Sequence, residues 1–301
     1  MKLLMLCREP RLYSCQRLKQ AAEMQGYQLD ILDPNRFLLT LSKGKFELFY
    51  QAGESFDKAR PAPFKIENYL GVLPRFGITS TEIGCHLLRH FELQGIPVLN
   101  SASAFKLARD KWQSLQQLAA HHIPIPDTQL TGESYALSES LKTNRFPLIA
   151  KTLSGSQGVG VMLFEAQSHA LSVLDTLRQA RIPTLTQQFI AESKGRDIRA
   201  FVIGNQVVAA MQRIGRGDEF RANIHQGGEA QPIDLSSDEK QLAIQAVQAI
   251  GLEVAGVDLV FSPDGLHVIE VNASPGLEMI EKTTGVDIAQ QMIAALLAKL
   301  A

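Results

Sequence analysis

An acid and an amide interrupt an apolar run near the end of the chain, in the stretch HVIEVNASPG from His267 to Gly276. A buried strand makes Glu270 and Asn272 costly unless they bind something, because an unpaired polar group loses its hydration there. The two residues are two positions apart, so their side chains point to the same face of a strand, roughly 7 Å apart at the backbone. Carboxylate and amide oxygens on one face are ligands that Mg²⁺ accepts. The stretch therefore suggests a metal site.

The preceding strand, VAGVDLVF, adds a third oxygen ligand and is joined to this one through a Ser-Pro-Asp-Gly turn. If a loop of five residues, 262–266, joins the strands, Asp258 lies opposite Glu270 on one face. Gly256 then lies opposite Asn272 and leaves room beside it. A loop one residue shorter, without a bulge, would break this alignment. The alternative is that Asp258 and Glu270 are structural ions paired with buried arginines, and the hairpin alone leaves both interpretations open.

A glycine-rich hairpin, KTLSGSQGVGV, offers a place for phosphate. It lacks the Gly-Lys-Ser/Thr ending of a Walker loop, and its spacing does not match a Rossmann turn. Backbone N–H groups of such a loop can cover phosphates, and the preceding Lys151 adds a compact positive charge. Lys111, Arg221 and Asn223 are further candidates for the same phosphates, and Phe189 offers its ring to adenine. The alternatives are a glycine turn without a ligand and ordinary solvated charges.

The elements that must position these residues begin with alternating strands and helices. The segments KLLMLC, SCQRLKQAAEMQG and QLDILDP follow this rhythm, which predicts a parallel sheet covered by helices. Ser14 and the pattern Thr79-x-x-Glu82 are the expected starts of two helices. The segment from Leu41 to Lys65 breaks the rhythm and is the least readable part.

After about residue 97 the pattern changes. The stretch SAFKLARDKWQSLQQLAAHH predicts one helix, and paired strands then indicate antiparallel sheets. One hairpin is expected to turn at Gly204-Asn205. A capping box at Ser236-x-x-Glu239 should start a helix that Gly251 ends.

Composition excludes several classes of protein. With 301 residues, 45% hydrophobic and 20% charged, the chain is an ordinary globular protein. A net charge of −1 gives no general attraction to DNA or to a membrane surface, so neither is expected as a partner. Three cysteines without a Cys-x-x-Cys pair predict neither a disulfide framework nor a zinc site. The opening MKLLMLC is too short for a signal peptide and is interpreted as a first strand, so a cytoplasmic protein is expected.

The order of these features resembles the ATP-grasp superfamily, and within it the RimK family of ribosomal-protein glutamate ligases. The resemblance rests on PRFG, ARDK, GSQGVGV, DIRAFVIGNQVVAA, HQGG, VAGVDLV and VIEVNASPGLEMIEKTTGVDIA. It implies an α/β and α+β fold, with a Rossmann-like pre-ATP-grasp domain followed by two α+β subdomains that hold ATP between them. The expected boundaries are residues 1–97 for the N-terminal domain, 98–187 for the small (lid) subdomain and 188–301 for the C-terminal subdomain.

The resemblance also implies roles for single residues. Asp258, Glu270 and Asn272 become ligands of two Mg²⁺ ions, with Mn²⁺ as an alternative. Arg199 is the expected catalytic residue, which stabilises the acyl phosphate or the tetrahedral oxyanion. The residues expected to contact ATP are Lys111, Lys151, Gly155, Ser156, Gln157, Gly158, Gln188, Phe189, Asp197, Arg221, Ala222 and Asn223.

The implied reaction is the ATP-dependent addition of L-glutamate to the C-terminus of a protein, small ribosomal subunit protein six, through an acyl phosphate. Family members tend to assemble from several subunits, so a homo-oligomer is expected. Two departures from the family concern the nucleotide: Gln188 replaces a usual acid, and Ala222 replaces a usual serine. The alternatives are an ATP-grasp ligase for a small-molecule or carrier-protein acceptor, and a catalytically silent ATP-binding regulator. The intact set of metal ligands speaks against the regulator.

Overall fold

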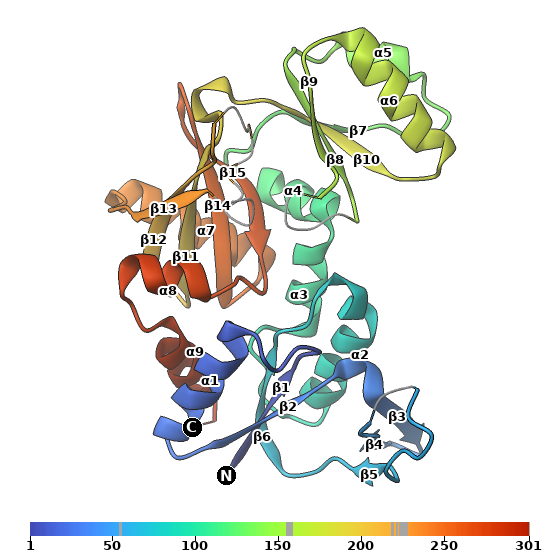
Figure 1. Cartoon of the computed structure of the whole chain (residues 1–301), viewed down its shortest axis with the longest axis vertical. Coiled ribbons are helices and arrows are strands. Elements are labelled where there is room, and N and C mark those ends of the chain that lie inside the picture. The colour runs from blue at the N-terminus through green and yellow to red at the C-terminus, as the bar shows by residue number, and fades with distance from the viewer. Residues whose placement is uncertain (54–55, 155–158, 218–219, 221, 223–227, 301) are drawn as a thin grey trace.

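The structure is a computed structural model that describes the whole chain except residues 54–55, 155–158, 218–219, 221, 223–227 and 301. In that part the strands form four sheets. Figure 1 shows the first sheet at the bottom of the molecule and the two largest sheets at the top. The expected mixture of α/β and α+β structure is confirmed.

The first sheet is parallel, as the alternating pattern predicts. Its strands β1 (Lys2–Leu6), β2 (Gln28–Leu32) and β6 (Tyr69–Pro74) lie in the order β2-β1-β6. Successive residues of β1 face opposite sides, so Leu3 and Met5 belong to one core cluster. Leu4 and Leu6 belong to the other. Among the helices that supply side chains to these clusters are α1 (Tyr13–Met24), α2 (Thr81–Leu93) and α9 (Ile288–Ala298).

The least readable segment forms a small antiparallel sheet beside the first one. Its strands are β3 (Phe37–Ser42), β4 (Lys45–Tyr50) and β5 (Phe64–Lys65). Short 3₁₀ turns precede β3 and α2, and they are η1 (Pro34–Arg36) and η2 (Ile78–Ser80). Leu38, Leu41 and Phe64 are exposed on this small sheet. It therefore presents apolar side chains at the surface.

The two expected helix starts in the N-terminal part are wrong. Helix α1 begins at Tyr13, and the hydroxyl of Ser14 instead accepts a hydrogen bond from the backbone N–H of Leu277, at 3.0 Å. Helix α2 begins at Thr81 without a side-chain cap, and the Thr79 hydroxyl accepts from Arg8 at 3.2 Å. Both side chains make tertiary contacts, which the local capping pattern does not reveal.

The single helix expected after the first sheet is two helices. They are α3 (Ala102–Arg109) and α4 (Lys111–Ala120). Asp110 separates them with an extended backbone, φ −91° and ψ 105°, and its carboxylate accepts from the Gln113 N–H at 2.9 Å. This is an N-cap, so Asp110 starts a new helix inside a sequence that favours one. In Figure 1 the two helices lead from the first sheet up to the upper sheets.

The second half of the chain contains two antiparallel sheets, as predicted. The four-stranded sheet has the order β7-β10-β8-β9. Its strands are β7 (Thr128–Leu130), β8 (Leu148–Thr152), β9 (Val161–Phe164) and β10 (Thr184–Gln188). The helices between these strands are α5 (Leu137–Lys142) and α6 (Gln167–Gln179). The five-stranded sheet has the order β13-β12-β11-β14-β15. Its strands are β11 (Arg196–Ile203), β12 (Gln206–Ile214), β13 (Glu229–Pro232), β14 (Val254–Ser262) and β15 (Gly265–Asn272). The helices in this part of the chain are η3 (Ala191–Ser193), α7 (Ser237–Ile250) and α8 (Glu278–Thr284).

Local signals in this half are accurate. Strands β11 and β12 turn at Gly204-Asn205, because Ile203 pairs with Gln206. Ser236 and Glu239 form both hydrogen bonds of a capping box at the start of α7. Gly251 ends the helix in the left-handed conformation, with φ 79°. These three predictions are confirmed.

The last helix returns to the first sheet. Helix α9 lies beside α1, and in Figure 1 the two chain ends are close together at the bottom. Leu296 packs against Gly71 of β6 so closely that a Cβ there would lie 3.1 Å from the leucine Cδ1. Tyr13 and Arg17 of α1 both donate to one carboxylate oxygen of Glu281, at 3.0 and 3.2 Å. Residues from both ends of the chain therefore share one core.

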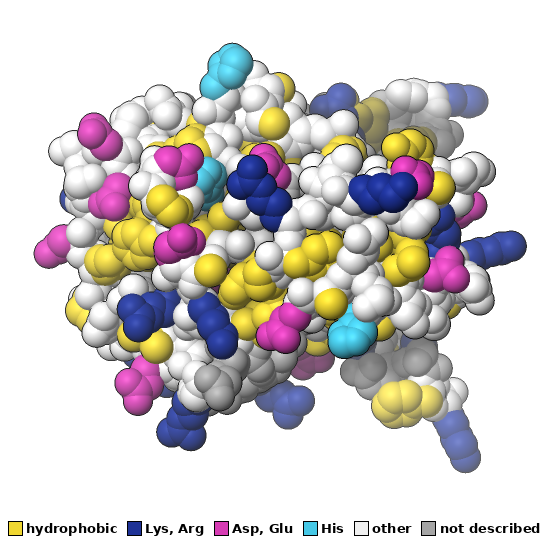
Figure 2. Space-filling view, turned by 90° about the horizontal axis from the view of Figure 1, so that it is seen from above, with side chains coloured by type: hydrophobic (Ala, Val, Ile, Leu, Met, Phe, Trp, Pro, Cys, Tyr) yellow, Lys and Arg dark blue, Asp and Glu magenta, His cyan; other side chains and the backbone are white. Residues whose placement is uncertain are grey.

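The surface carries both signs of charge. Figure 2 shows one face, seen from above, on which acidic and basic side chains are interspersed among apolar ones. This distribution agrees with the net charge of −1. Among the helices of the described residues, none has the length and apolar character needed to cross a membrane.

Candidate active site

The acidic hairpin has the expected alignment but not the expected loop. Ser262 pairs with Gly265, so the loop has two residues rather than five. The register then shifts between Asp258 and Leu259, because Ile269 is an extra residue in β15 and forms a β-bulge. Beyond the bulge Asp258 pairs with Glu270, as predicted. The bulge compensates for the short loop, and the two acids share one face.

Gly256 also takes its predicted place opposite Asn272. The room beside this glycine is filled, however, since a Cβ there would lie 2.8 Å from the Cβ of Pro275. The expectation that Gly256 leaves space for a ligand is therefore wrong. Its function is to let the turn after β15 pack against the sheet.

Asp258 is buried between two arginines. Arg199, its cross-strand partner on β11, donates from Nε to Oδ1 at 2.7 Å and from Nη2 to Oδ2 at 2.6 Å. Arg213 lies 3.0 Å from Oδ2, and the Asn272 amide donates to the same oxygen at 3.4 Å. Burial opposes ionisation of Asp258, but the two guanidinium groups outweigh it and lower the pKa to about 2. The residue is a carboxylate at neutral pH.

A second acid completes this network. Asp197 accepts two hydrogen bonds from Arg213, both at 2.6 Å. Burial raises the pKa of Asp197 to about 6, although the Arg213 charge acts in the opposite direction. Two carboxylates and two guanidinium groups thus alternate across β11, β12 and β14, and their charges balance. Asp197 is a predicted nucleotide contact, and in this structure its buried carboxylate fixes Arg213.

Sequence reasoning missed Arg213. Counting back from the turn, with Ile203 opposite Gln206, a regular hairpin would place Gln212 opposite Asp197. The register shifts between Phe201 and Val202, and Arg213 takes that position. Only the bulge on β12 produces this pairing, and period-two alternation does not reveal a bulge.

Glu270 shares a face with Asp258 but differs from it in burial and in hydrogen bonding. Its side chain is exposed, and no hydrogen bond or ion pair joins it to another described residue. The positive charges that act on it come from Arg109, Lys111 and Lys151. Asp258 thus has the arginine pairing of the structural alternative, while Glu270 is available to a ligand.

The two predicted phosphate lysines come from separate elements. Lys111, at the start of α4, donates from Nζ to the carbonyl oxygens of Thr152 and Leu153, at 3.0 and 3.3 Å. Lys151, on β8, donates to Oε1 of Gln187 at 2.7 Å. Burial lowers the pKa of both lysines, and Glu270 raises it in both cases. The fold therefore brings two lysines towards the acidic hairpin from the four-stranded sheet and α4.

The remaining predicted contacts are only partly described. Gln188 ends β10, and its backbone N–H donates to the carbonyl of Asp127 at 2.8 Å. Phe189 is half-buried, and Ala222 is buried. The predicted residues that lie outside the described part of the chain are Gly155, Ser156, Gln157, Gly158, Arg221 and Asn223.

The acids fit a Mg²⁺ site by the chemistry of their oxygens. No cluster of three His, Cys, Asp or Glu side chains occurs among the described residues, so the set is two carboxylates and one amide. Oδ1 of Asp258 accepts one hydrogen bond, which leaves it a lone pair, and Glu270 is unpaired within the described chain. Mg²⁺ commonly uses one or two carboxylates and fills its other positions with water and phosphate oxygens. These three side chains would suit an ion that bridges to a nucleotide.

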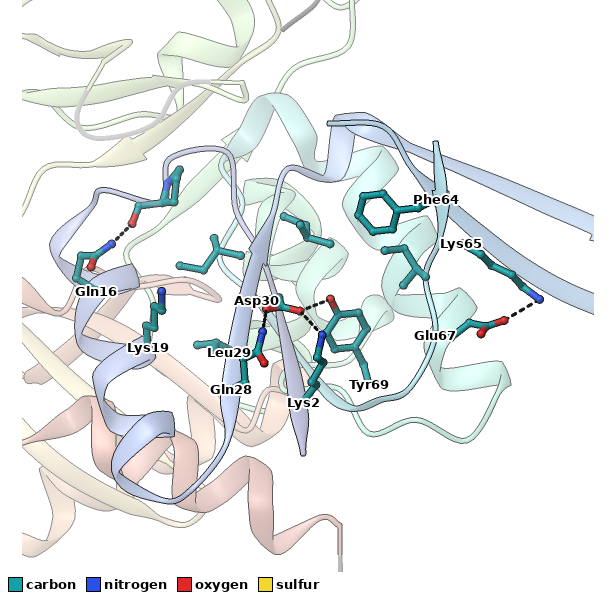
Figure 3. A pocket seen from close by; sticks show the side chains of 14 residues that line it. Lys2, Gln16, Lys19, Gln28, Leu29, Asp30, Phe64, Lys65, Glu67 and Tyr69 are labelled. Atoms are coloured by element: carbon teal, nitrogen blue, oxygen red, sulfur yellow. Dashed lines mark hydrogen bonds and ion pairs between the residues drawn. The ribbon is translucent and has the colours of Figure 1, made fainter. Parts of the chain in front are cut away.

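A hollow elsewhere on the molecule does not belong to this site. It has a volume of about 660 Å³ and lies along β2 and β5 at the outer edge of the first sheet. Figure 3 shows Asp30 there, joined by dashed lines to Gln28, Lys2 and Tyr69. The Tyr69 hydroxyl donates to Asp30 at 2.7 Å, and Lys2 lies 3.6 Å away. The central acid of this hollow already has its partners.

Family models and a curated relative agree on the family to which this chain is similar. Residues 108–296 match the family model of the RimK-like ATP-grasp domain, and residues 1–105 match that of the RimK pre-ATP-grasp domain. A probable alpha-L-glutamate ligase of Pasteurella multocida is 57% identical over 298 residues, which cover 98% of this chain and 94% of that protein.

Solved structures show the same fold at low sequence identity. The ATP-grasp ligase PsnB, complexed with a phosphomimetic variant of a minimal precursor, Mg and ADP, matches with a TM-score of 0.72 at 19% identity and covers 100% of this chain and 99% of its own. A RiPP-associated ATP-grasp ligase of Chryseobacterium gregarium, in complex with ADP and a leader and core peptide, matches with a TM-score of 0.72 at 18% identity and covers 99% and 97%. The ATP-grasp fold expected from the sequence is confirmed.

Proposed function

The chain belongs to the RimK-like family of ATP-grasp ligases, and from this premise we propose that it joins L-glutamate to the C-terminal carboxylate of a peptide or protein. The observation that carries the proposal is the pairing of Asp258 with Glu270 on one face, within the field of Lys111 and Lys151. Such an arrangement suits a nucleotide and its metal ion. The name of the Pasteurella relative supports glutamate as the substrate.

The reaction needs positioning and charge neutralisation more than a strong base. The acceptor carboxylate takes the terminal phosphoryl group of ATP, and ADP leaves. The glutamate amine then attacks the acyl carbon, the C–N bond forms, and the C–O bond to phosphate breaks as the amine loses a proton. Mg²⁺ at Asp258, Glu270 and Asn272 would supply neutralisation of phosphate charge.

The protein's own groups have distinct tasks in this scheme. Lys111 and Lys151 would bind phosphate oxygens, because both ammonium groups are within electrostatic reach of Glu270, one of the proposed metal ligands. Arg199 would stabilise the oxyanion that forms at the acyl carbon. Its guanidinium group is fixed by two hydrogen bonds to Asp258, so it needs little reorganisation. Asp258 therefore has two roles, in orienting Arg199 and in binding the metal ion.

Several finer features belong to the same proposal. We infer two Mg²⁺ ions, with Mn²⁺ able to replace them, and small ribosomal subunit protein six as the acceptor. Peptide ligands in the related solved structures favour a peptide over a small acceptor. The exposed Leu38, Leu41 and Phe64 support assembly into a homo-oligomer, and the use of ATP supports a cytoplasmic site of action.

The experiment combines the protein with ATP, Mg²⁺, L-glutamate and a panel of acceptors. ADP release and product mass are measured, and the expected result is a mass increase of whole glutamyl units at a peptide C-terminus. If turnover occurs only with a small-molecule or carrier-protein acceptor, the proposal of a peptide or protein acceptor is wrong. Tight ATP binding without ADP release for any acceptor would contradict the ligase.

A further inference from the structure

Arg75 lies where the first sheet meets the acidic hairpin. It follows directly after β6, and its backbone N–H donates to the carbonyl of Leu6, the last residue of β1, at 2.9 Å. It is therefore at the carboxyl ends of two parallel strands, the edge at which open α/β sheets bind ligands. Its Nη2 donates to the carbonyl of Pro275 at 2.8 Å, in the turn that follows Asn272.

Three side chains of the N-terminal part fix that turn. Asn100 donates to the carbonyl of Ala273 at 3.2 Å, Arg75 to that of Pro275, and the hydroxyl of Ser14 accepts from the N–H of Leu277. Alternate residues of the turn are thus held from the same side. Arg75 consequently has a defined position relative to the metal ligands on β15.

A second arginine is held beside the first. Arg109 ends α3, donates from Nη2 to the carbonyl of Phe76 at 2.9 Å, and lies over the Phe105 ring at 5.1 Å. The Phe76 ring packs on Phe105, with centroids 4.6 Å apart, and occupies the space where a Cβ at Gly84 would stand. The buried phenylalanine pair thus supports the guanidinium group of Arg109.

Among the described residues these two charges lack a carboxylate at ion-pair distance, and the acid that acts on Arg109 from further away is Glu270 of the candidate site. In the described part of the chain neither Arg75 nor Arg109 forms an ion pair, and Nε of Arg109 is buried without a hydrogen-bond acceptor. Burial lowers the pKa of Arg75, and the charge of Arg109 lowers it further, while the thiols of Cys7 and Cys15 raise it. Buried arginines normally have a carboxylate, because desolvation of an unpaired charge is costly. Two adjacent buried guanidinium groups are therefore expected to bind an anionic ligand.

We propose that Arg75 and Arg109 form the binding site for a carboxylate of the incoming glutamate, an inference that rests on the proposed function. Guanidinium groups bind carboxylates in a two-pronged geometry, and Arg75 has donors beyond the one bound to Pro275. The phosphates are assigned to Lys111 and Lys151, which carry the other positive charges near Glu270. A glutamate held at the arginines would direct its amine towards the face that carries Asp258 and Glu270.

The test measures kcat and the KM of each substrate in Arg75→Lys and Arg109→Lys. Lysine keeps the charge and removes the fork, so the KM for glutamate should rise about tenfold or more, while the KM for ATP stays within about twofold. Arg89→Lys is the matched control, because Arg89 is exposed on α2 and pairs only with Glu92 among the described residues, at 3.4 Å. It should leave all constants unchanged.

Substrate analogues identify the carboxylate. Glutamine and isoglutamine each replace one of the two carboxylates of glutamate by an amide, and the wild-type enzyme should reject the analogue that lacks the recognised group. The arginine variants should lose this discrimination, which loss of stability alone would not cause. Circular dichroism and thermal unfolding verify that each variant is folded.

The outcomes separate the inference from the function. If the wild-type enzyme uses glutamate and both variants keep its KM, the inference is wrong and the function stands. If the KM for ATP rises instead, the arginines serve the nucleotide, and the inference is again wrong. If the wild-type enzyme neither binds glutamate in calorimetry nor releases ADP with it, the proposed function fails, and the inference fails with it.

Discussion

At the scale of single residues, the two acids of the site have different environments. Asp258 is 5% exposed and balanced by Arg199 and Arg213, whereas Glu270 is exposed and unpaired within the described chain. Asp258 has a structural role in addition to the metal-binding role proposed for it, whereas the proposed ligand role is the only one that Glu270 has among the described residues. Substitutions at the two positions should therefore separate stability from activity.

We expect Glu270→Gln to abolish ADP release while changing the free energy of unfolding by less than about 0.5 kcal/mol, since surface changes rarely cost more. Asp258→Asn should also abolish turnover, but it should destabilise the protein by about 3 kcal/mol because it removes one partner of a buried charge network. Urea denaturation and an ADP-release assay measure the two effects. Full activity in Glu270→Gln would exclude a metal role for that residue.

Cysteine titration gives a second prediction at this scale. The hydrogen bond from Cys15, 3.4 Å between sulfurs, lowers the pKa of Cys7 from 9.0 to about 7, although burial opposes it. Burial raises the pKa of Cys85 to about 11. Ultraviolet thiolate absorbance of the folded protein should show one step near pH 7, and Cys7→Ser should remove it.

The same shift predicts a change of stability with pH. The folded state releases the Cys7 proton more readily than the unfolded state, so this contribution is fully present above pH 9.0 and is lost as pH falls through about 7. Stability should rise from pH 7 to 9 more in the wild type than in Cys7→Ser. Equal slopes in denaturation at several pH values would contradict the shift.

At the scale of elements, helix caps decide how the site is assembled. Asp110 divides a helical sequence in two and places Lys111 at the first position of α4. Ser236 caps α7, whose residues belong to none of the predicted sites. The two caps are chemically similar, but only Asp110 is adjacent to Lys111.

Asp110→Ala and Ser236→Ala should each lower the free energy of unfolding by about 1 kcal/mol, the usual value of an N-cap. Only Asp110→Ala should raise the KM for ATP, because α3 and α4 can then join and move Lys111. Denaturation curves and steady-state kinetics of both variants test this. An unchanged KM for ATP in Asp110→Ala would mean that Lys111 is positioned by other contacts.

The elements also show what the sequence can and cannot predict. Alternation and turn residues were sufficient for the parallel sheet, for the turn at Gly204-Asn205 and for the box at Ser236, because these signals are local. The bulges on β12 and β15 cannot be predicted from the sequence. The bulge on β12 is the reason that the sequence does not reveal Arg213 as the partner of Asp197. The bulge on β15 is the reason that the sequence predicts a loop of five residues, 262–266, where the structure has two.

Long-range partners explain the other failures. Ser14 and Thr79 have the residue types of caps, yet each hydroxyl is used by a distant residue, Leu277 and Arg8. The alignment of Asp258, Glu270 and Asn272 could be predicted from the sequence because the three residues belong to one hairpin. The arginines Arg75 and Arg109 could not, since only the folded chain places them together.

At the scale of the whole molecule, Asn100 joins the first sheet to the five-stranded one. It is 1% exposed, accepts from the backbone N–H groups of Glu253 and Val254 at 2.7 and 2.8 Å, and donates to the carbonyls of Val254 and Ala273. One side chain thus satisfies four backbone groups at a buried junction.

Asn100→Ala should destabilise the protein by about 3 kcal/mol, since it leaves several buried backbone groups without partners. It should also reduce cooperativity, so that calorimetry resolves two transitions where the wild type has one. Gln231→Ala is the control, because it removes only an exposed hydrogen bond to Gln212, of 2.8 Å. A single sharp transition in Asn100→Ala would show that the core shared with α9 is sufficient to couple the two parts.

Because α9 packs on the first sheet, the core of that sheet can be completed only after α9 has been synthesised. During synthesis β1 and α1 leave the ribosome before α9, but the face that includes Leu3, Met5 and Leu18 is covered partly by Ile293 and Leu296 of α9. Most domains at the start of a chain can fold before the rest is made. Here β1 and α1 must wait for α9, so their core is completed only after more than 250 further residues have been made.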